Sequence, residues 1–154
     1  SKVSGIRTEL LGLIEGMDYC LDWKPEPSAW SVRQVLYHIL DTPVGGIHEV
    51  VRGMLSGELR EFEIWADRDN MTPERMAYDL EQIRENIDEF FHGLDRAIES
   101  ATEEDFDGKS ALAHLKSRDL DEDRSVQELL DRAFEVHWMG HLAQINELRD
   151  GLGM

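Results

Sequence analysis

The chain is poor in cysteine, proline and positive charge. Its 154 residues include one cysteine, Cys20, and four prolines, and 16 lysines and arginines stand against 33 aspartates and glutamates. A single cysteine excludes a disulfide within the chain and is typical of a reducing compartment. The net charge of −17 would repel nucleic-acid phosphates and anionic lipid headgroups alike. We therefore expect neither a nucleic acid nor a membrane as a partner.

Long apolar runs are also missing. No uncharged stretch reaches the roughly 18 residues that a membrane-spanning helix needs. The first residues do not show the basic head and apolar stretch of a signal peptide, so we expect a cytoplasmic protein. The residues that are present, 41% of them hydrophobic, suffice for a sizeable core. The length fits a single domain over residues 1–154.

Four parts of the chain repeat apolar residues at intervals of three and four, the pattern of amphipathic helices. These parts are residues 6–21, 31–57, 72–98 and 125–151. The third contains the longest seam, from Met76 to Ile98, and Pro43 predicts a break in the second. Residues 58–70 show no clear period, and residues 110–116 suggest one short helix. The absence of a convincing strand pattern predicts an all-α bundle.

Two histidines, His137 and His141, lie one helical turn apart within the apolar stripe of the last segment. Both imidazoles should point inward and reach one ion, most simply zinc. His38 lies on the inner side of the second segment and is a candidate third ligand. Three imidazoles without a fourth protein ligand leave an open coordination position, as in catalytic zinc sites. Nickel and ferrous iron also accept imidazole, and the alternative is that these histidines are hydrogen-bonded core residues.

Three further residues near these segments are ambiguous from sequence. Gln144 shares the face of the paired histidines and can orient a ligand or a bound water, or simply pack. His48 follows Gly45 and Gly46 and can face the same cavity or the surface. Cys20 lies near the apolar face of the first segment and is expected to be a small core residue rather than a nucleophile. No residue is assigned a catalytic role.

Two stretches carry a resemblance to a known family. WSVRQVLYHILD (residues 30–41) and HWMGHLAQI (residues 137–145) are similar to the second-helix and last-helix motifs of the DinB-like superfamily. The order and separation of the motifs also agree. The resemblance implies an up-down-down-up four-helix bundle and often a homodimer. It also implies a divalent metal, nickel or zinc, on His38, His137 and His141.

The resemblance also implies a class of chemistry. Characterised relatives include thiol transferases that join bacillithiol or a similar low-molecular-weight thiol to an electrophile, and mycothiol-dependent isomerases. The family often has Arg and Gly after its second paired histidine, whereas this chain has Leu142 and Ala143. We therefore expect a metal-dependent enzyme acting on a small molecule by thiol transfer or hydrolase-type chemistry. The alternative is a non-catalytic stress-response or binding module that keeps the metal as a structural clip.

Overall fold

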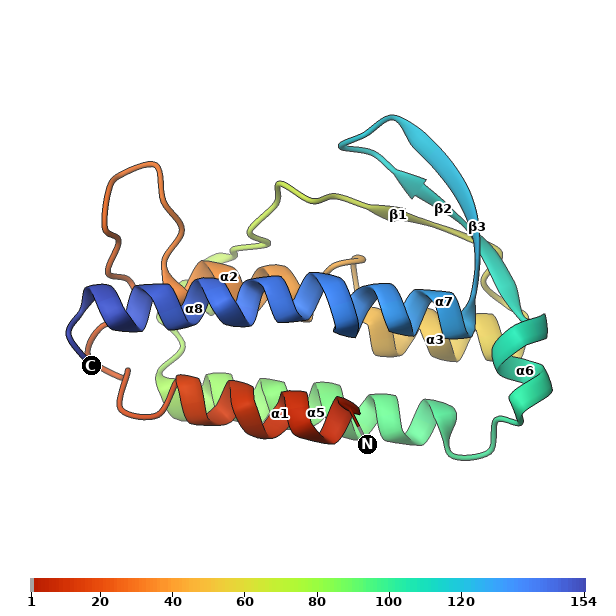
Figure 1. Cartoon of the computed structure of the whole chain (residues 1–154), viewed down its shortest axis with the longest axis horizontal. Helices are drawn as coiled ribbons and strands as arrows, with labels where there is room; N and C mark the ends of the chain where they lie inside the picture. The colour runs from red at the N-terminus through yellow and green to blue at the C-terminus, as the bar shows by residue number, and fades with distance from the viewer. Residues whose placement is uncertain (1) are drawn as a thin grey trace.

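The computed structural model describes residues 2–154, which form a group of long helices with a small sheet over one end (Figure 1). The helices are α1 (Lys2–Leu13), α2 (Val32–Leu40), α3 (Ile47–Ser56), α4 (Pro73–Ala77), α5 (Leu80–Ile98), α6 (Glu103–Gly108), α7 (Val126–Asp131), the π-helix η1 (Arg132–Trp138) and α8 (Met139–Gly151). The strands are β1 (Glu61–Ile64), β2 (Ser110–Leu115) and β3 (Leu120–Ser125). None of the helices in residues 2–154 is long and apolar enough to cross a membrane.

The long helices enclose the core. α1 and the segment from α7 to α8 run in one direction, and α2, α3 and α5 run in the other (Figure 1). α1 and α2 both pack against α8, and α3 packs against α5. Leu10, Leu36, Ile87 and Trp138, from four of these helical segments, are almost completely buried. The site described below lies where α2 faces the last helical segment.

The sheet corrects the expected fold class. The chain is not an all-α four-helix bundle, because β1 pairs with β2 in parallel and β2 pairs with β3 in antiparallel orientation. Residues 110–116, expected to form a short helix, contain β2 instead. Its alternate residues Ala111, Ala113 and Leu115 are buried and face the helices. This period of two is typical of a half-buried strand, but two alanines make it a weak signal.

The observed starts of the helices agree with the sequence prediction better than their observed lengths do. Ser31 and Ser125, the first residues of two predicted helical segments, form capping boxes at the starts of α2 and α7. α1, however, ends at Leu13 instead of continuing to Leu21, and Gly16 beyond it has a φ of 77°, outside the helical region. The third segment is divided by extended backbone at Tyr78 into α4 and α5, so Met76 is half exposed and outside the core seam.

Candidate metal centre

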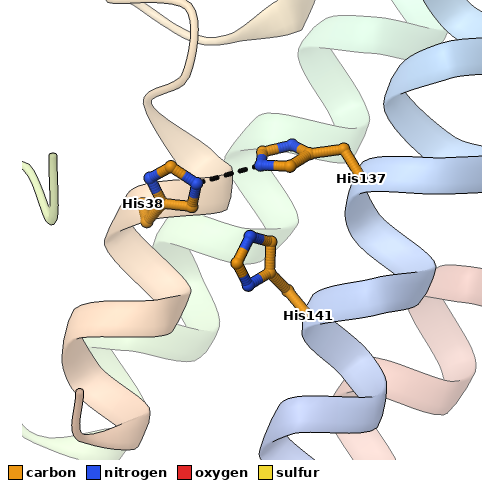
Figure 2. A group of neighbouring side chains, drawn as sticks. All are labelled: His38, His137 and His141. Carbon is orange, nitrogen blue, oxygen red and sulfur yellow. Dashed lines mark hydrogen bonds between the residues drawn. The ribbon is translucent and has the colours of Figure 1, made fainter. Parts of the chain in front are cut away.

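The structure brings the three candidate histidines together. His38 comes from α2, His137 from the end of η1 and His141 from α8, and the three rings face one another (Figure 2). One ring nitrogen from each lies within 4.8 Å of the other two. The ring centroids are 4.7–4.9 Å apart in all three pairs. This group can hold a divalent metal ion.

A backbone carbonyl fixes the tautomer of His38. Nδ1 of this buried ring lies 2.6 Å from the carbonyl oxygen of Arg68, in the loop between β1 and α4. A carbonyl oxygen only accepts hydrogen bonds, so Nδ1 carries the proton and Nε2 presents its lone pair. Nε2 lies 2.9 Å from Nε2 of His137, which donates in this contact (Figure 2). Asn70 holds the loop in place by donating to the carbonyl oxygen of Tyr37 on α2.

Gln144 fixes the tautomer of His141 in the same way. Nδ1 of His141 lies 2.7 Å from Oε1 of Gln144, which accepts its proton. The Nε2 lone pair of His141 is thereby left free. A hydrogen-bond acceptor on the far nitrogen is the usual partner of a metal-ligating histidine, because it fixes the ring and raises its basicity. Gln144 therefore contacts a candidate ligand, as an acceptor from the ring rather than as a donor.

The surroundings of His38 and His137 keep these two imidazoles uncharged. Burial lowers the pKa of His137 to about 3, with further lowering by the neighbouring His141 and His38. Burial also lowers the pKa of His38 from its usual value, and the nearby His141 adds to the effect. Both imidazoles are therefore neutral at pH 7. Neutral imidazole is the form that binds metals, so the residues present fit a divalent ion.

The paired histidines occupy the edge of the core rather than its centre. His137 and His141 are only partly buried, whereas Trp138 and Leu142 beside them are buried. The predicted inner stripe is wrong at this point, because the buried positions run from Phe134 through Trp138 and Leu142 and pass beside the two histidines. Before them, the buried positions jump by five residues, from Leu129 to Phe134, as the chain enters the π-helix η1, in which hydrogen bonds join residues five apart. Leu142, which stands where relatives often have arginine, packs in the core.

A cavity of about 480 Å³ adjoins the histidines. It lies under the sheet, between the sheet, α3, α7 and η1, and His137 and Thr42 are part of its wall. Most of its surface is apolar, and three arginines complete it. A volume in this range is typical of small-molecule sites. The three-histidine group therefore borders a space that can admit an organic ligand.

The family model described as the DinB superfamily matches residues 4–145. The chain belongs to the DinB superfamily. No curated protein sequence and no solved structure matches it.

The other residues that the sequence singled out lie away from the centre of this DinB-superfamily protein. His48 packs edge-on against Phe90, with ring centroids 4.8 Å apart, and is outside the histidine group. Burial lowers its pKa. Cys20 is buried, and burial raises the pKa of its thiol, so it is a core residue as expected.

Sequence reasoning missed two contributions to this DinB-superfamily site. The Arg68 carbonyl is a backbone group, so no residue type could have indicated it. The three arginines of the cavity come from the β2–β3 turn, from β3 and from η1. Their convergence depends on the sheet, which was not predicted. Besides the weak period of two in β2, the available signal was the alternation of charged and apolar residues in Glu61–Ile64, which is short.

Proposed function

We propose that this protein binds one divalent metal ion through His38, His137 and His141 and uses it in thiol-transfer or hydrolase-type chemistry on a small molecule. The observation that carries the proposal is the double position of His137. It belongs to the histidine group and also to the wall of the cavity. A ligand in the cavity would therefore lie against the candidate metal site.

Two features favour catalysis over a structural clip. A structural zinc site is closed by four protein ligands, whereas a catalytic site keeps one position for water or substrate. Within residues 2–154, no cysteine, carboxylate or fourth histidine joins the group. The adjoining cavity supplies the access from solvent that exchange at the metal requires.

The residues around the site have distinct roles in the proposed chemistry. A divalent metal, when bound, supplies Lewis acidity that lowers the pKa of a thiol or water. Arg68 and Gln144 hold the Nδ1 protons of His38 and His141, so that Nε2 of each ring carries a lone pair rather than a proton. The mostly apolar cavity wall would hold the organic part of the substrate beside the histidines. Zinc or nickel is the ion we propose, with iron as an alternative, and a low-molecular-weight thiol and a homodimer remain predictions.

Metal analysis of protein purified without a histidine tag tests the proposal directly. We expect one divalent ion per chain, lost on His141→Ala and retained on His92→Ala, since His92 is exposed on α5. The cobalt-substituted protein should then change its visible spectrum when small thiols or azide are added. A cobalt spectrum that no added ligand alters would contradict an open position and support the structural clip.

A further inference from the structure

The cavity beside His137 is cationic in an otherwise strongly acidic protein. Its wall includes Arg118, Arg124 and Arg132 but, among the described residues, no aspartate or glutamate. The whole chain carries a net charge of −17. Three arginines in the wall of one mostly apolar cavity are therefore not a consequence of overall composition.

One carboxylate near the cavity is shared between two of these arginines. Oε2 of Glu122 lies 3.0 Å from Nη2 of Arg124 and 3.2 Å from Nη1 of Arg132. Arg118 makes no side-chain hydrogen bond or ion pair with any residue in 2–154, although it is near enough to help lower the pKa of Glu122. The cluster therefore has three positive charges and one negative charge. Its surplus is available to an anionic ligand.

The most buried of the three cations is built into the sheet. Arg124 lies on β3 opposite Ala111 of β2, and its side chain is 8% exposed. A buried charge is costly unless it is paired or hydrogen-bonded. Glu122 contacts only the Nε and Nη2 edge of this guanidinium.

The rest of the cavity wall is suited to the hydrocarbon part of a ligand. Ile47, Ile64, Leu115, Leu129 and Val136 contribute apolar surface from α3, the sheet and the last helical segment. Arg132 and His137 both face this space, and they are five residues apart in a π-helix, where that spacing corresponds to one turn. A cation and a candidate metal ligand thus stand one helical turn apart on the same wall.

We propose that the substrate of the three-histidine centre is an amphipathic organic anion. Its apolar body fills the cavity, and its carboxylate or phosphate head group pairs with Arg118, Arg132 and the free edge of Arg124. Guanidinium groups bind both kinds of oxyanion through charge-assisted hydrogen bonds. The statement that this ligand is a substrate rests on the proposed function, whereas its binding to the cavity does not require the metal.

Calorimetric titration of chelator-treated protein with octanoate, octyl phosphate and octan-1-ol tests the anion site. We expect one octanoate or octyl phosphate per chain and at least tenfold weaker binding of the neutral alcohol. The ratio of the two anion affinities identifies the preferred head group. Equal affinity for octanol would overturn the proposal, because the arginines would then contribute nothing.

Substitutions in the cavity wall test where the anion binds. Arg118→Gln and Arg132→Gln should each weaken octanoate binding about tenfold, the effect expected of one charge-assisted contact. Arg96→Gln is the matched control, because Arg96 is exposed on α5 and outside the cavity. Ala133→Phe should fill the cavity and abolish binding, with unchanged circular dichroism as the check on folding. Full binding in this variant would overturn the proposal.

Repeating the titration on zinc-loaded protein separates the two proposals. Anion binding that is lost in the arginine variants and present without zinc supports the cavity site even if no catalysis is found. Anion binding that occurs only with zinc and survives Arg118→Gln and Arg132→Gln would refute the anion site and leave the metal proposal intact.

Discussion

Nδ1 of His38 donates a hydrogen bond to the carbonyl oxygen of Arg68 over 2.6 Å. The group that orients the most buried candidate ligand is therefore part of the backbone. The Arg68 side chain lies elsewhere, with its guanidinium carbon 3.6 Å from the centre of a Trp65 ring. Loss of the side chain should leave the carbonyl in place, whereas loss of the imidazole removes a ligand.

Substitutions at these two positions should accordingly have opposite outcomes. We expect His38→Ala, His137→Ala and His141→Ala each to lose the metal under competition with a chelator, because two imidazoles hold an ion far less tightly than three. Arg68→Ala should keep full occupancy. The measurement is metal content after dialysis against a graded chelator series. Full occupancy in His38→Ala would show that the ligand assignment is wrong.

Gln144 should influence metal affinity without contacting the ion. Gln144→Leu removes the acceptor for Nδ1 of His141, and the loss of such a partner typically weakens metal binding about 10- to 100-fold. Gln144→Glu retains an acceptor and should bind at least as tightly as the wild type. Asn146→Leu, on an exposed position of α8, is the control. Equal chelator competition by all four proteins would assign Gln144 to packing alone.

The metal-free protein should lose stability as the pH falls. The pKa of His137 is lowered to about 3 and that of His38 is also lowered, so below the unfolded value near 6.5 the unfolded chain binds more protons. The stability gained by keeping these imidazoles neutral is complete above pH 6.5 and falls as the pH drops below that value, and for His137 the fall continues toward pH 3. At pH 5.5 each histidine that folding keeps neutral lowers the free energy of unfolding by about 1.4 kcal/mol relative to its value at high pH.

Urea unfolding of chelator-treated protein at pH 7 and pH 5.5 measures this effect. The wild type should lose about 1 kcal/mol over this interval from His137 alone, with a further loss from His38, and His137→Gln should lose correspondingly less. In the loaded protein the same protons compete with the metal, so occupancy should fall with more than one proton's dependence. Occupancy unchanged down to about pH 4.5 would argue against imidazole ligands.

Arg33 should be more important for stability than its surface counterpart Arg7. Its buried guanidinium pairs with Asp22 at 2.7 Å and donates to the carbonyl oxygens of Arg75 and Tyr78. Arg33→Gln leaves those carbonyls without their donor, at a cost of about 2 kcal/mol or more. Arg7→Gln breaks an exposed ion pair and should change the free energy of unfolding by about 0.5 kcal/mol or less. Urea denaturation compares the two.

The parts of the site that sequence reasoning could anticipate are those encoded by local spacing. The capping boxes at Ser31 and Ser125 fixed where two helices begin. The interval between His137 and His141 put two imidazoles on neighbouring turns. Bringing His38 to them depends on helix packing, which the apolar stripes indicate only in outline.

The sheet and the cavity could not be predicted from the sequence for a different reason. β3 has charged residues at four of its six positions, and its inward-facing Arg124 would be assigned to the surface by residue type. It is buried opposite Ala111 of β2, and Glu122 supplies a partner for its charge. Pairing between distant segments, as between β1 and β2, is not written in any short window of the sequence.

The wide turn of η1 also sets the rotational phase between the two ends of the last helical segment. Deleting one residue between Leu129 and Phe134 would leave four residues for this turn, close to the 3.6 residues of an α-helical turn. Leu129 and His141 would then keep their present faces, because the π-helix already accommodates one additional residue. The chain can therefore lose a residue in this interval and keep its core, whereas a loss from the regular turns of α8 would rotate the residues beyond it by about 100°.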